Sequence, residues 1–158
     1  MIRLHAASPE ATRALGARLA QALSATSRAH GIVVTLSGDL GAGKTTLVAG
    51  LLAALGHEGP VRSPTYTLIE PYRLADWEVQ HCDLYRLRHP DELEDLGLRD
   101  LCGPGVLLLV EWPERAEGRL PPVDLVLRLA YEGDGRVAEV QPISAAGQVL
   151  ASGLSGQT

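Results

Sequence analysis

The sequence predicts an α/β domain in which a mostly parallel sheet lies between two layers of helices. Short runs of apolar, β-branched residues alternate with segments whose apolar residues recur at helical spacing. This alternation is typical of layered α/β domains. Near the C-terminus, two further strand-like runs flank a glycine-containing turn. They predict that the central sheet is completed by a C-terminal β-hairpin.

The composition suits one globular domain without disulfide or zinc support. The chain has 158 residues, of which 46% are hydrophobic and 21% charged. Its net charge of −5 argues against direct, unaided binding of nucleic acid, which usually needs a basic face. No apolar stretch is long enough to cross a membrane, and the first residues lack the apolar core of a signal peptide. We therefore expect a cytoplasmic protein with reduced cysteines.

The first half of the chain gives the clearest secondary-structure signals. A short strand is expected at 2–5, and Ser8-Pro9 is typical of an N-cap followed by proline in the first helical turn. Apolar residues at helical spacing then predict a helix at 9–23. The continuous apolar run at 32–36 predicts a buried parallel strand, and residues 45–55 form a strong helix pattern.

The second half predicts more strands and one acidic helix. Strands are expected at 65–69, 77–84 and 106–111, a helix at 90–101, and hairpin strands at 125–131 and 137–143. The hairpin loop is predicted to be longer than the tightest type. Because the last residues are rich in Ser, Gly and Ala, we divide the chain into a domain at 1–146 and a flexible tail at 147–158.

Residues 38–45, Gly-Asp-Leu-Gly-Ala-Gly-Lys-Thr, match the phosphate-loop pattern G-x-x-x-x-G-K-[ST] at every fixed position. A predicted strand precedes the loop and a predicted helix follows it, as the pattern requires. The glycines let backbone N–H groups converge on a phosphate. Lys44 would contact the β- and γ-phosphates, and the Thr45 hydroxyl would bind Mg²⁺. The expected fold is therefore the three-layer P-loop NTPase fold, with ATP and Mg²⁺ as ligands.

Adenine is the expected base. Guanine-specific switch proteins bind their base with an Asn-Lys-x-Asp loop. Lys44 is the only lysine of the chain, so that loop cannot exist here, and ATP is favoured over GTP.

A P-loop site also needs an acidic residue at the end of a neighbouring strand, to organise Mg²⁺ or water. Glu111 closes the 106–111 run and is the preferred candidate, although it could simply mark the exit from the sheet. Asp83, at the end of the 77–84 run, is either a second candidate or a turn-forming aspartate. His81 is expected to pack or hydrogen-bond, because no metal-binding partner has suitable spacing.

Two further positions stay open on local sequence alone. Thr65 follows Ser63-Pro64 in a loop where P-loop switch proteins can carry a threonine that senses the γ-phosphate. An ordinary turn is the simpler interpretation there. Trp112 follows Glu111 and packs either near the nucleotide or in the core.

Four blocks together resemble the TsaE family (formerly YjeE), bacterial ATPases that support threonylcarbamoyladenosine formation on tRNA. They are the P-loop at 38–46, Ser-Pro-Thr-Tyr-Thr-Leu at 63–68, His-Cys-Asp-Leu-Tyr-Arg-Leu at 81–87 and Glu-Trp-Pro-Glu at 111–114. The segment at 92–98 also resembles the family's acidic helix, and weaker similarities lie at Thr12 and 135–136. The chain departs from the family pattern at Tyr66, which replaces phenylalanine, and at Pro71, so the loop after Ile69 is expected to differ.

The resemblance implies roles for particular residues. Phosphate binding falls to Lys44 and the backbone of Gly41, Ala42, Gly43, Thr45 and Thr46. Thr45 and Glu111 would coordinate Mg²⁺, Asp83 would position water or metal, and Thr65 would be the switch threonine. Thr12 and Arg136 would contact the nucleotide from outside the loop. Trp112 is a further candidate for nucleotide contact because of its position after Glu111.

The resemblance also implies partners. These are TsaD, the threonylcarbamoyl transferase, and TsaB, which pairs with TsaD. ATP hydrolysis would reset their complex between rounds, and tRNA would be contacted only indirectly. Two alternatives remain: a small-molecule kinase, or an assembly module gated by nucleotide in which hydrolysis is incidental. Because no arginine finger is evident, we expect slow hydrolysis by the isolated chain.

Overall fold

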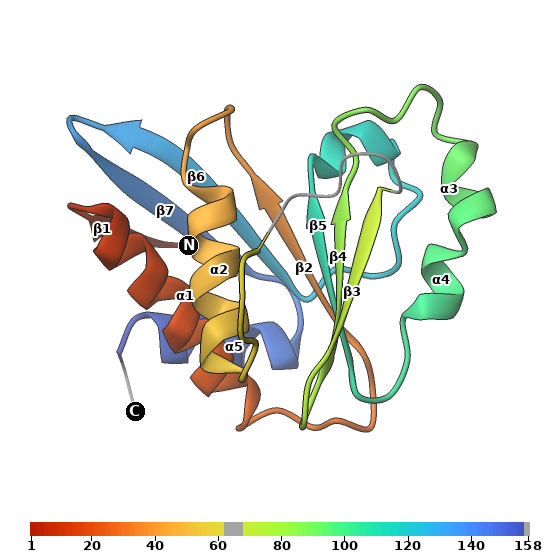
Figure 1. Ribbon diagram of the computed structural model, residues 1–158, viewed down its shortest axis with the longest axis horizontal. Helices are drawn as coiled ribbons and strands as arrows, with labels where there is room; N and C mark the ends of the chain where they lie inside the picture. The colour runs from red at the N-terminus through yellow and green to blue at the C-terminus, as the bar shows by residue number, and fades with distance from the viewer. Residues whose placement is uncertain (62–67, 157–158) are drawn as a thin grey trace.

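The computed structural model describes residues 1–61 and 68–156. Within them, seven strands form a single sheet in the order β1-β7-β6-β2-β5-β4-β3 (Figure 1). The strands are β1 (Ile2–Ala6), β2 (Ile32–Ser37), β3 (Ile69–Arg73), β4 (Glu78–Asp83), β5 (Val106–Glu111), β6 (Leu125–Glu132) and β7 (Gly135–Pro142). The four central strands, β6, β2, β5 and β4, run parallel, and antiparallel pairs complete both edges. The predicted mostly parallel centre and hairpin are confirmed.

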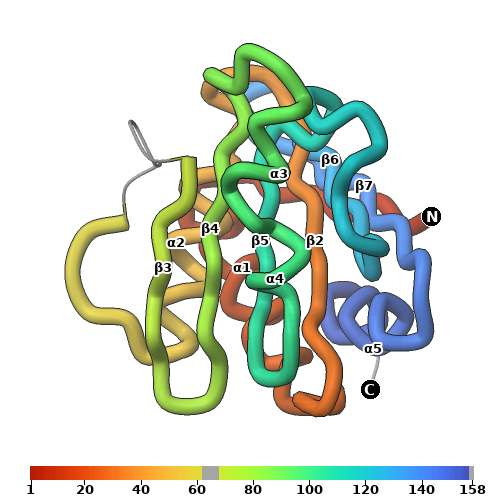
Figure 2. The backbone as a smooth tube through the Cα atoms, turned by 90° about the vertical axis from the view of Figure 1, so that its right-hand side faces the viewer, coloured from red at the N-terminus to blue at the C-terminus, as the bar shows by residue number. Residues whose placement is uncertain are grey.

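Helices cover both faces of the sheet (Figures 1 and 2). One layer holds α1 (Pro9–Leu23), α2 (Lys44–Ala54) and α5 (Ala145–Leu154); the other holds α3 (Glu92–Leu96), α4 (Leu98–Leu101) and the 3-10 turn η1 (Pro113–Ala116). Side chains alternate between the two cores, so Val34 and Leu36 of β2 face the first layer and Val33 faces the second. The three-layer prediction is confirmed. Among the described residues, no helix has the length and apolar character needed to cross a membrane.

Helices α1 and α2 pack unusually closely through two glycines. A Cβ atom on Gly16 would lie 2.0 Å from the carbonyl oxygen of Leu47, and one on Gly50 would lie 2.1 Å from that of Arg13. The start of α1 is fixed by Ser8, whose Oγ accepts a hydrogen bond from the Ala11 N–H at 3.1 Å, as the predicted cap requires. The two glycines thus set the close approach of α1 and α2, and Ser8 sets where α1 begins.

Three local predictions were wrong. The helix expected at 90–101 is divided into α3 and α4, because Gly97 adopts a left-handed conformation with φ of 66°. The hairpin turn is tight: Glu132 pairs with Gly135, leaving two residues between the strands. Strand β3 covers Ile69–Arg73 rather than ending at 69, and it includes Pro71, which an edge strand tolerates.

The flexible tail expected at 147–158 was also wrong for residues 147–154, which form most of α5. Leu150 and Leu154 are buried in the first core. The glycines that suggested flexibility permit close packing instead. A Cβ atom on Gly147 would lie 1.8 Å from the carbonyl oxygen of Asp124, and one on Gly153 would lie 2.5 Å from the Cβ of Ala22.

Candidate nucleotide site

The P-loop lies between β2 and α2, at the edge of the sheet where the parallel strands end. Gly38, Gly41 and Gly43 have φ angles of 146°, 83° and 104°, which L side chains rarely adopt. Helix α2 begins at Lys44 with no side-chain cap. In this arrangement a bound phosphate can accept the first helical N–H groups. The local geometry is therefore that of a phosphate-binding loop.

Lys44 is held inside this loop by two contacts. Its side chain is buried, its Nζ donates to the Gly38 carbonyl oxygen at 2.5 Å, and it lies 4.0 Å from the centroid of the Trp112 ring. Trp112 has a left-handed backbone, with φ of 57°, and its ring lies 5.0 Å from that of Tyr85. The tryptophan therefore packs against both the P-loop lysine and the second core, and its contact with the nucleotide stays a prediction.

We call His81, Asp83 and Glu111 the metal side of the site. Strands β4 and β5 are parallel neighbours, and their register sets Asp83 directly opposite Glu111 at the ends of both strands. By strand alternation, both carboxylates lie on the face that α2 covers. Glu111 is only 2% exposed, and its Oε2 lies 2.5 Å from Nε2 of the fully buried His81.

The electrostatics of the metal side favour a cation. Burial raises the pKa of Asp83 above its ordinary value of 3.8, and the neighbouring Glu111 carboxylate raises it further. The Tyr85 N–H, which donates to Asp83 Oδ1 at 3.0 Å, opposes this shift, as do His81 and Lys44. A positive ion beside the two carboxylates would relieve both their repulsion and their desolvation.

The donor set fits Mg²⁺. Carboxylate and hydroxyl oxygens are hard ligands, and Mg²⁺ is usually held by one or two carboxylates together with substrate phosphates and water. Thr45 lies in the first turn of α2 and is exposed, on the same sheet face as Asp83 and Glu111. In the described part of the chain, no cluster of three or more His, Cys, Asp or Glu side chains could hold a metal by itself.

We call Thr12, Tyr131 and Arg136 the base side of the site. Arg136 donates through Nη2 to the Gly41 carbonyl oxygen at 3.1 Å, and its guanidinium lies 4.2 Å from the centroid of the Tyr131 ring. A cavity of about 110 Å³ opens here. It is lined by Ser8, Pro9, Thr12, Gly41, Gly43, Thr46, Asp134, Gly135 and Arg136. A Cβ atom on Gly43 would approach the Thr12 methyl group to 3.4 Å, so the glycine keeps this space open.

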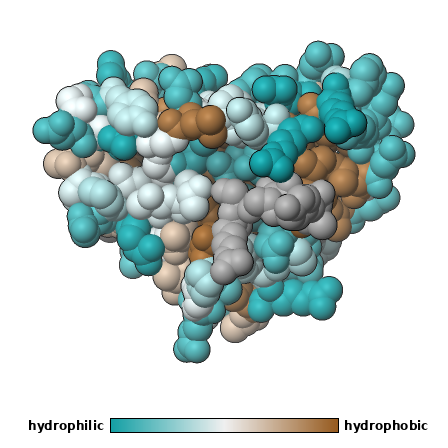
Figure 3. Space-filling model, turned by 45° about the horizontal axis from the view of Figure 1, so that its top comes forward, coloured by the Kyte–Doolittle hydropathy of each residue, from teal (hydrophilic) through white to brown (hydrophobic). Residues whose placement is uncertain are grey.

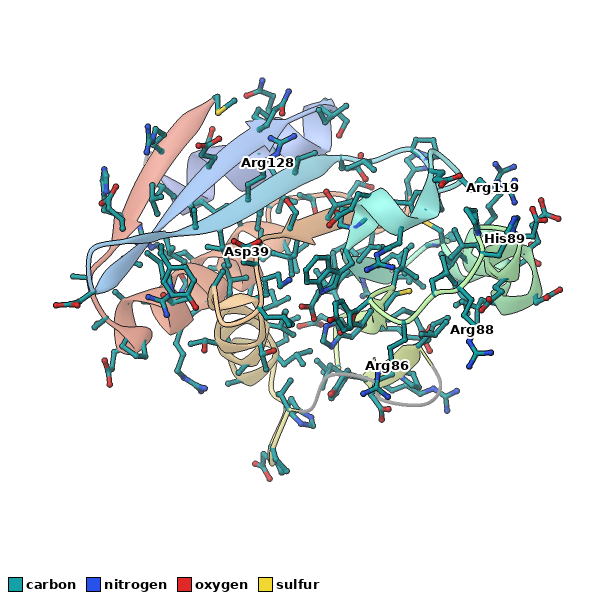
Figure 4. The ribbon with its side chains drawn as sticks, turned by 90° about the horizontal axis from the view of Figure 1, so that it is seen from above. Asp39, Arg86, Arg88, His89, Arg119 and Arg128 are labelled. Atoms are coloured by element: carbon teal, nitrogen blue, oxygen red, sulfur yellow. The ribbon has the colours of Figure 1, made fainter. Side chains whose placement is uncertain are left out.

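The surroundings of the site are mixed in character. Leu40 and Tyr131 are 64% and 55% exposed beside the cavity, and the Tyr131 hydroxyl donates to the Leu40 carbonyl oxygen at 3.3 Å. Figure 3 shows this end of the molecule as largely hydrophilic, with a few apolar patches. In Figure 4, Asp39 of the P-loop lies beside the β6–β7 hairpin, whereas Arg86 and Arg88 lie across the molecule from it.

The structure brings most of the predicted residues to one edge of the sheet. Thr12, Gly41, Gly43, Thr46 and Arg136 line a single cavity, and Lys44 contacts Trp112 nearby. Ala42 is fully buried within the loop, and its side chain belongs to the first core. Thr65 lies outside the described residues, so its predicted role stays a prediction.

Sequence reasoning missed two contacts of this site. His81 was expected to pack or hydrogen-bond, but its bond to Glu111 was not foreseen; the signal was its position two residues before Asp83, on the same strand face. Tyr131 was not considered at all. It is the hairpin partner of Arg136, so a correct hairpin register would have found it.

Comparison with known proteins gives one consistent result. The family model for the threonylcarbamoyl adenosine biosynthesis protein TsaE matches residues 6–138. A Haemophilus influenzae protein, named tRNA threonylcarbamoyladenosine biosynthesis protein TsaE, is 42% identical over 140 residues, covering 89% of each chain. A Nostoc protein of the same name is 38% identical over 150 residues, covering 91% of this chain and 88% of its own.

A solved structure agrees with these sequence relatives. The crystal structure of Bacillus subtilis YdiB superimposes with a TM-score of 0.73 at 31% identity, covering 98% of this chain and 94% of that one. The match therefore extends over the whole sheet and both helical layers, rather than over the P-loop alone. Since the family model and the relatives each span most of the chain, this protein belongs to the TsaE family.

Proposed function

We propose that this chain is an ATPase of tRNA threonylcarbamoyladenosine biosynthesis, which binds ATP and Mg²⁺ at residues 38–45 and hydrolyses the γ-phosphate. One observation carries the proposal. A buried P-loop lysine, Lys44, and a pair of strand-end carboxylates, Asp83 and Glu111, meet at one edge of the sheet. Relatives that match nearly the whole chain are named for this modification.

Each residue of the site has a task in this reaction. The backbone N–H groups of residues 41–46 would hold the phosphates, and Lys44 would exchange the Gly38 carbonyl oxygen for phosphate oxygens. Glu111 and Asp83, with the Thr45 hydroxyl, would hold Mg²⁺ and orient the attacking water. When bound, Mg²⁺ would neutralise charge that develops on the transferred phosphoryl group. Thr12 and Arg136 would enclose the base, and Trp112 would cover the lysine.

The isolated chain should turn over slowly. Arg136 supplies the guanidinium group on the base side of the site. Its two terminal nitrogens already donate hydrogen bonds to the carbonyl oxygens of Gly135 and Gly41. It is therefore poorly placed to stabilise the transition state as an arginine finger does. We propose that TsaB and TsaD complete the site, and that tRNA is contacted through them, in keeping with the net charge of −5.

Phosphate release from ATP tests this proposal. The wild-type chain is assayed alone and with TsaB and TsaD, beside Lys44→Ala and, as a surface control, Glu117→Gln. We expect stimulation by the two partners, loss of turnover in Lys44→Ala, and wild-type behaviour in the control. Retained turnover in Lys44→Ala would contradict the site. Turnover that follows an added small-molecule acceptor instead of the partners would indicate a kinase.

A second assay separates an ATPase from an assembly module gated by nucleotide. Glu111→Gln keeps the shape of the side chain but removes its charge. If hydrolysis is required, this variant still binds nucleotide but fails to support tRNA modification with TsaB and TsaD. If it supports modification fully, binding alone is the function and hydrolysis is incidental.

A further inference from the structure

One buried polar side chain has no task in the reaction outlined above. His81, in β4, has 0% of its surface exposed. Its Nε2 lies 2.5 Å from Oε2 of Glu111, whereas its Nδ1 is buried without a hydrogen-bond partner among the described residues. An unpaired polar atom in the core opposes folding. Leucine at this place would pack without that cost, so packing alone does not account for the histidine.

The contact between His81 and Glu111 is fixed by the sheet. His81 is in register with Leu109, and Glu111 is two residues further along β5, on the same face. The imidazole therefore reaches the carboxylate from the interior of the sheet, and Asp83 flanks the carboxylate at the strand end. A carboxylate oxygen accepts hydrogen bonds, so with its proton on Nε2 the imidazole donates to Glu111 Oε2.

We propose that His81 is a positioning residue that holds Glu111 for the magnesium site. Its Nε2–H occupies Oε2 of Glu111, which fixes the carboxylate rotamer and leaves Oε1 for the metal or its bound water. Partners of this kind behind a ligand commonly change metal affinity or activity by 10- to 100-fold when removed. The catalytic part of this inference rests on the proposed function, but the effect on Glu111 is measurable without turnover.

A matched pair of amides tests the role of the Nε2 donor. In His81→Gln the side-chain N–H can reach Glu111, as Nε2 does. In His81→Asn the same amide is one methylene shorter and ends near the place of Nδ1. His81→Leu removes every polar atom at similar volume. Gln80→Leu is the control, since Gln80 is a buried polar residue of the same strand whose side chain faces the other layer.

The first readout is the Mg²⁺ concentration that gives half-maximal tightening of ADP binding, measured at equilibrium. We expect it to rise 10- to 100-fold in His81→Asn and His81→Leu. It should stay within about threefold of wild type in His81→Gln and Gln80→Leu, and ADP affinity without Mg²⁺ should not change. The second readout is hydrolysis with the partners, where kcat should fall by a similar factor while KM changes little.

Coupling to Glu111 distinguishes positioning from general support of the fold. In a Glu111→Gln background, His81→Asn should change the Mg²⁺ requirement by less than about twofold, because the group on which it acts is already altered. Equal effects in both backgrounds, or no difference between the asparagine and glutamine variants, would overturn the proposal. Urea unfolding of every variant shows which ones are folded. If His81→Leu is not folded, the comparison of His81→Gln with His81→Asn is sufficient to test the proposal.

The test of His81 can also be distinguished from the test of the proposed ATPase function. A wild-type chain that never hydrolyses ATP, even with TsaB and TsaD, contradicts the ATPase proposal. The Mg²⁺ titration with ADP still decides whether His81 holds Glu111 for the metal.

Discussion

The two sides of the candidate site are built in different ways. The base side comes from the first turn of α1 and from the β6–β7 turn, and it meets the P-loop mainly at backbone atoms, as Arg136 does at the Gly41 carbonyl oxygen. The metal side comes from the ends of two central strands, where His81 and Glu111 are buried side chains bonded to each other. Changes on the base side should therefore alter nucleotide affinity, and changes on the metal side should alter turnover.

Glu111→Gln is expected to separate the two sides most clearly, by lowering turnover while leaving nucleotide affinity almost unchanged. Loss of the carboxylate charge at a buried strand end should lower kcat by roughly 100-fold or more, because charge placed for the transition state is lost. Nucleotide affinity should stay within about threefold, since the P-loop and base side are unchanged. Single-turnover hydrolysis with the partners and equilibrium ADP binding measure the two effects. A variant that loses binding and keeps kcat would reverse the assignment of the sides.

The next largest effect is expected from Gly16→Ala, which tests what holds the base side in place. Its Cβ would lie 2.0 Å from a backbone oxygen of α2, so the helices must separate. We expect a loss of about 2 kcal/mol in the free energy of unfolding and weaker ADP binding, since Thr12 moves with α1. Urea unfolding and ADP titration check both. Gly103→Ala is the control because its Cβ would meet nothing within 4 Å.

Arg136→Gln should weaken ADP binding about tenfold, or about 1.4 kcal/mol, with kcat at saturating ATP within about threefold of wild type. The variant loses the guanidinium that stacks on Tyr131 and bonds to the P-loop carbonyl. Arg128→Gln is the matched control, because Arg128 is an exposed arginine of the neighbouring strand that bonds to Gln141 (Figure 4). Unchanged ADP affinity in Arg136→Gln would remove this arginine from the site.

The smallest effect is a gain in stability from Asp83→Asn. Burial raises the pKa of Asp83 in the folded protein, so the folded state binds its proton more tightly than the unfolded state does. The charged aspartate therefore opposes folding above its folded pKa, and this penalty is absent below the unfolded value near 3.8. Asp83→Asn should unfold at a higher temperature than wild type at neutral pH, with the difference shrinking as the pH falls towards that value.

The exposed Asp76 supplies the control for this pH series, as Asp76→Asn. Thermal unfolding of the three proteins is compared between neutral pH and about pH 4 without Mg²⁺. A destabilised Asp83→Asn at neutral pH would mean that the bond from Tyr85 outweighs burial.

The base side and the metal side of the site also differ in how much of each could be predicted from the sequence. The P-loop is a contiguous pattern, and Ser8, the 32–36 run and the 106–111 run carry local signals, so β2, β5 and α1 were predicted to within about a residue or two. The metal side depends on strand register, which has no local signal. Asp83 and Glu111 were thus candidates separately, and their alignment came only with the structure.

Two of the errors, the single helix at 90–101 and the tail at 147–154, have a common physical cause in glycine. Gly97 breaks a helix that the leucine spacing favoured, whereas Gly147 and Gly153 allow close packing in a helix that composition had assigned to a tail. The same residue type thus ends one helix and fits another against its neighbours. Thr12 illustrates the limit on the base side, because only the family resemblance, and no local rule, connected the first helix to the P-loop.

The most direct test of the account is the structure of this chain bound to ADP and Mg²⁺. The account predicts phosphates against the backbone of residues 41–46, the base in the cavity between Thr12 and Arg136, and Mg²⁺ beside Thr45 on the side of Glu111. A nucleotide bound elsewhere, or phosphates away from Lys44 with the base cavity empty, would contradict it.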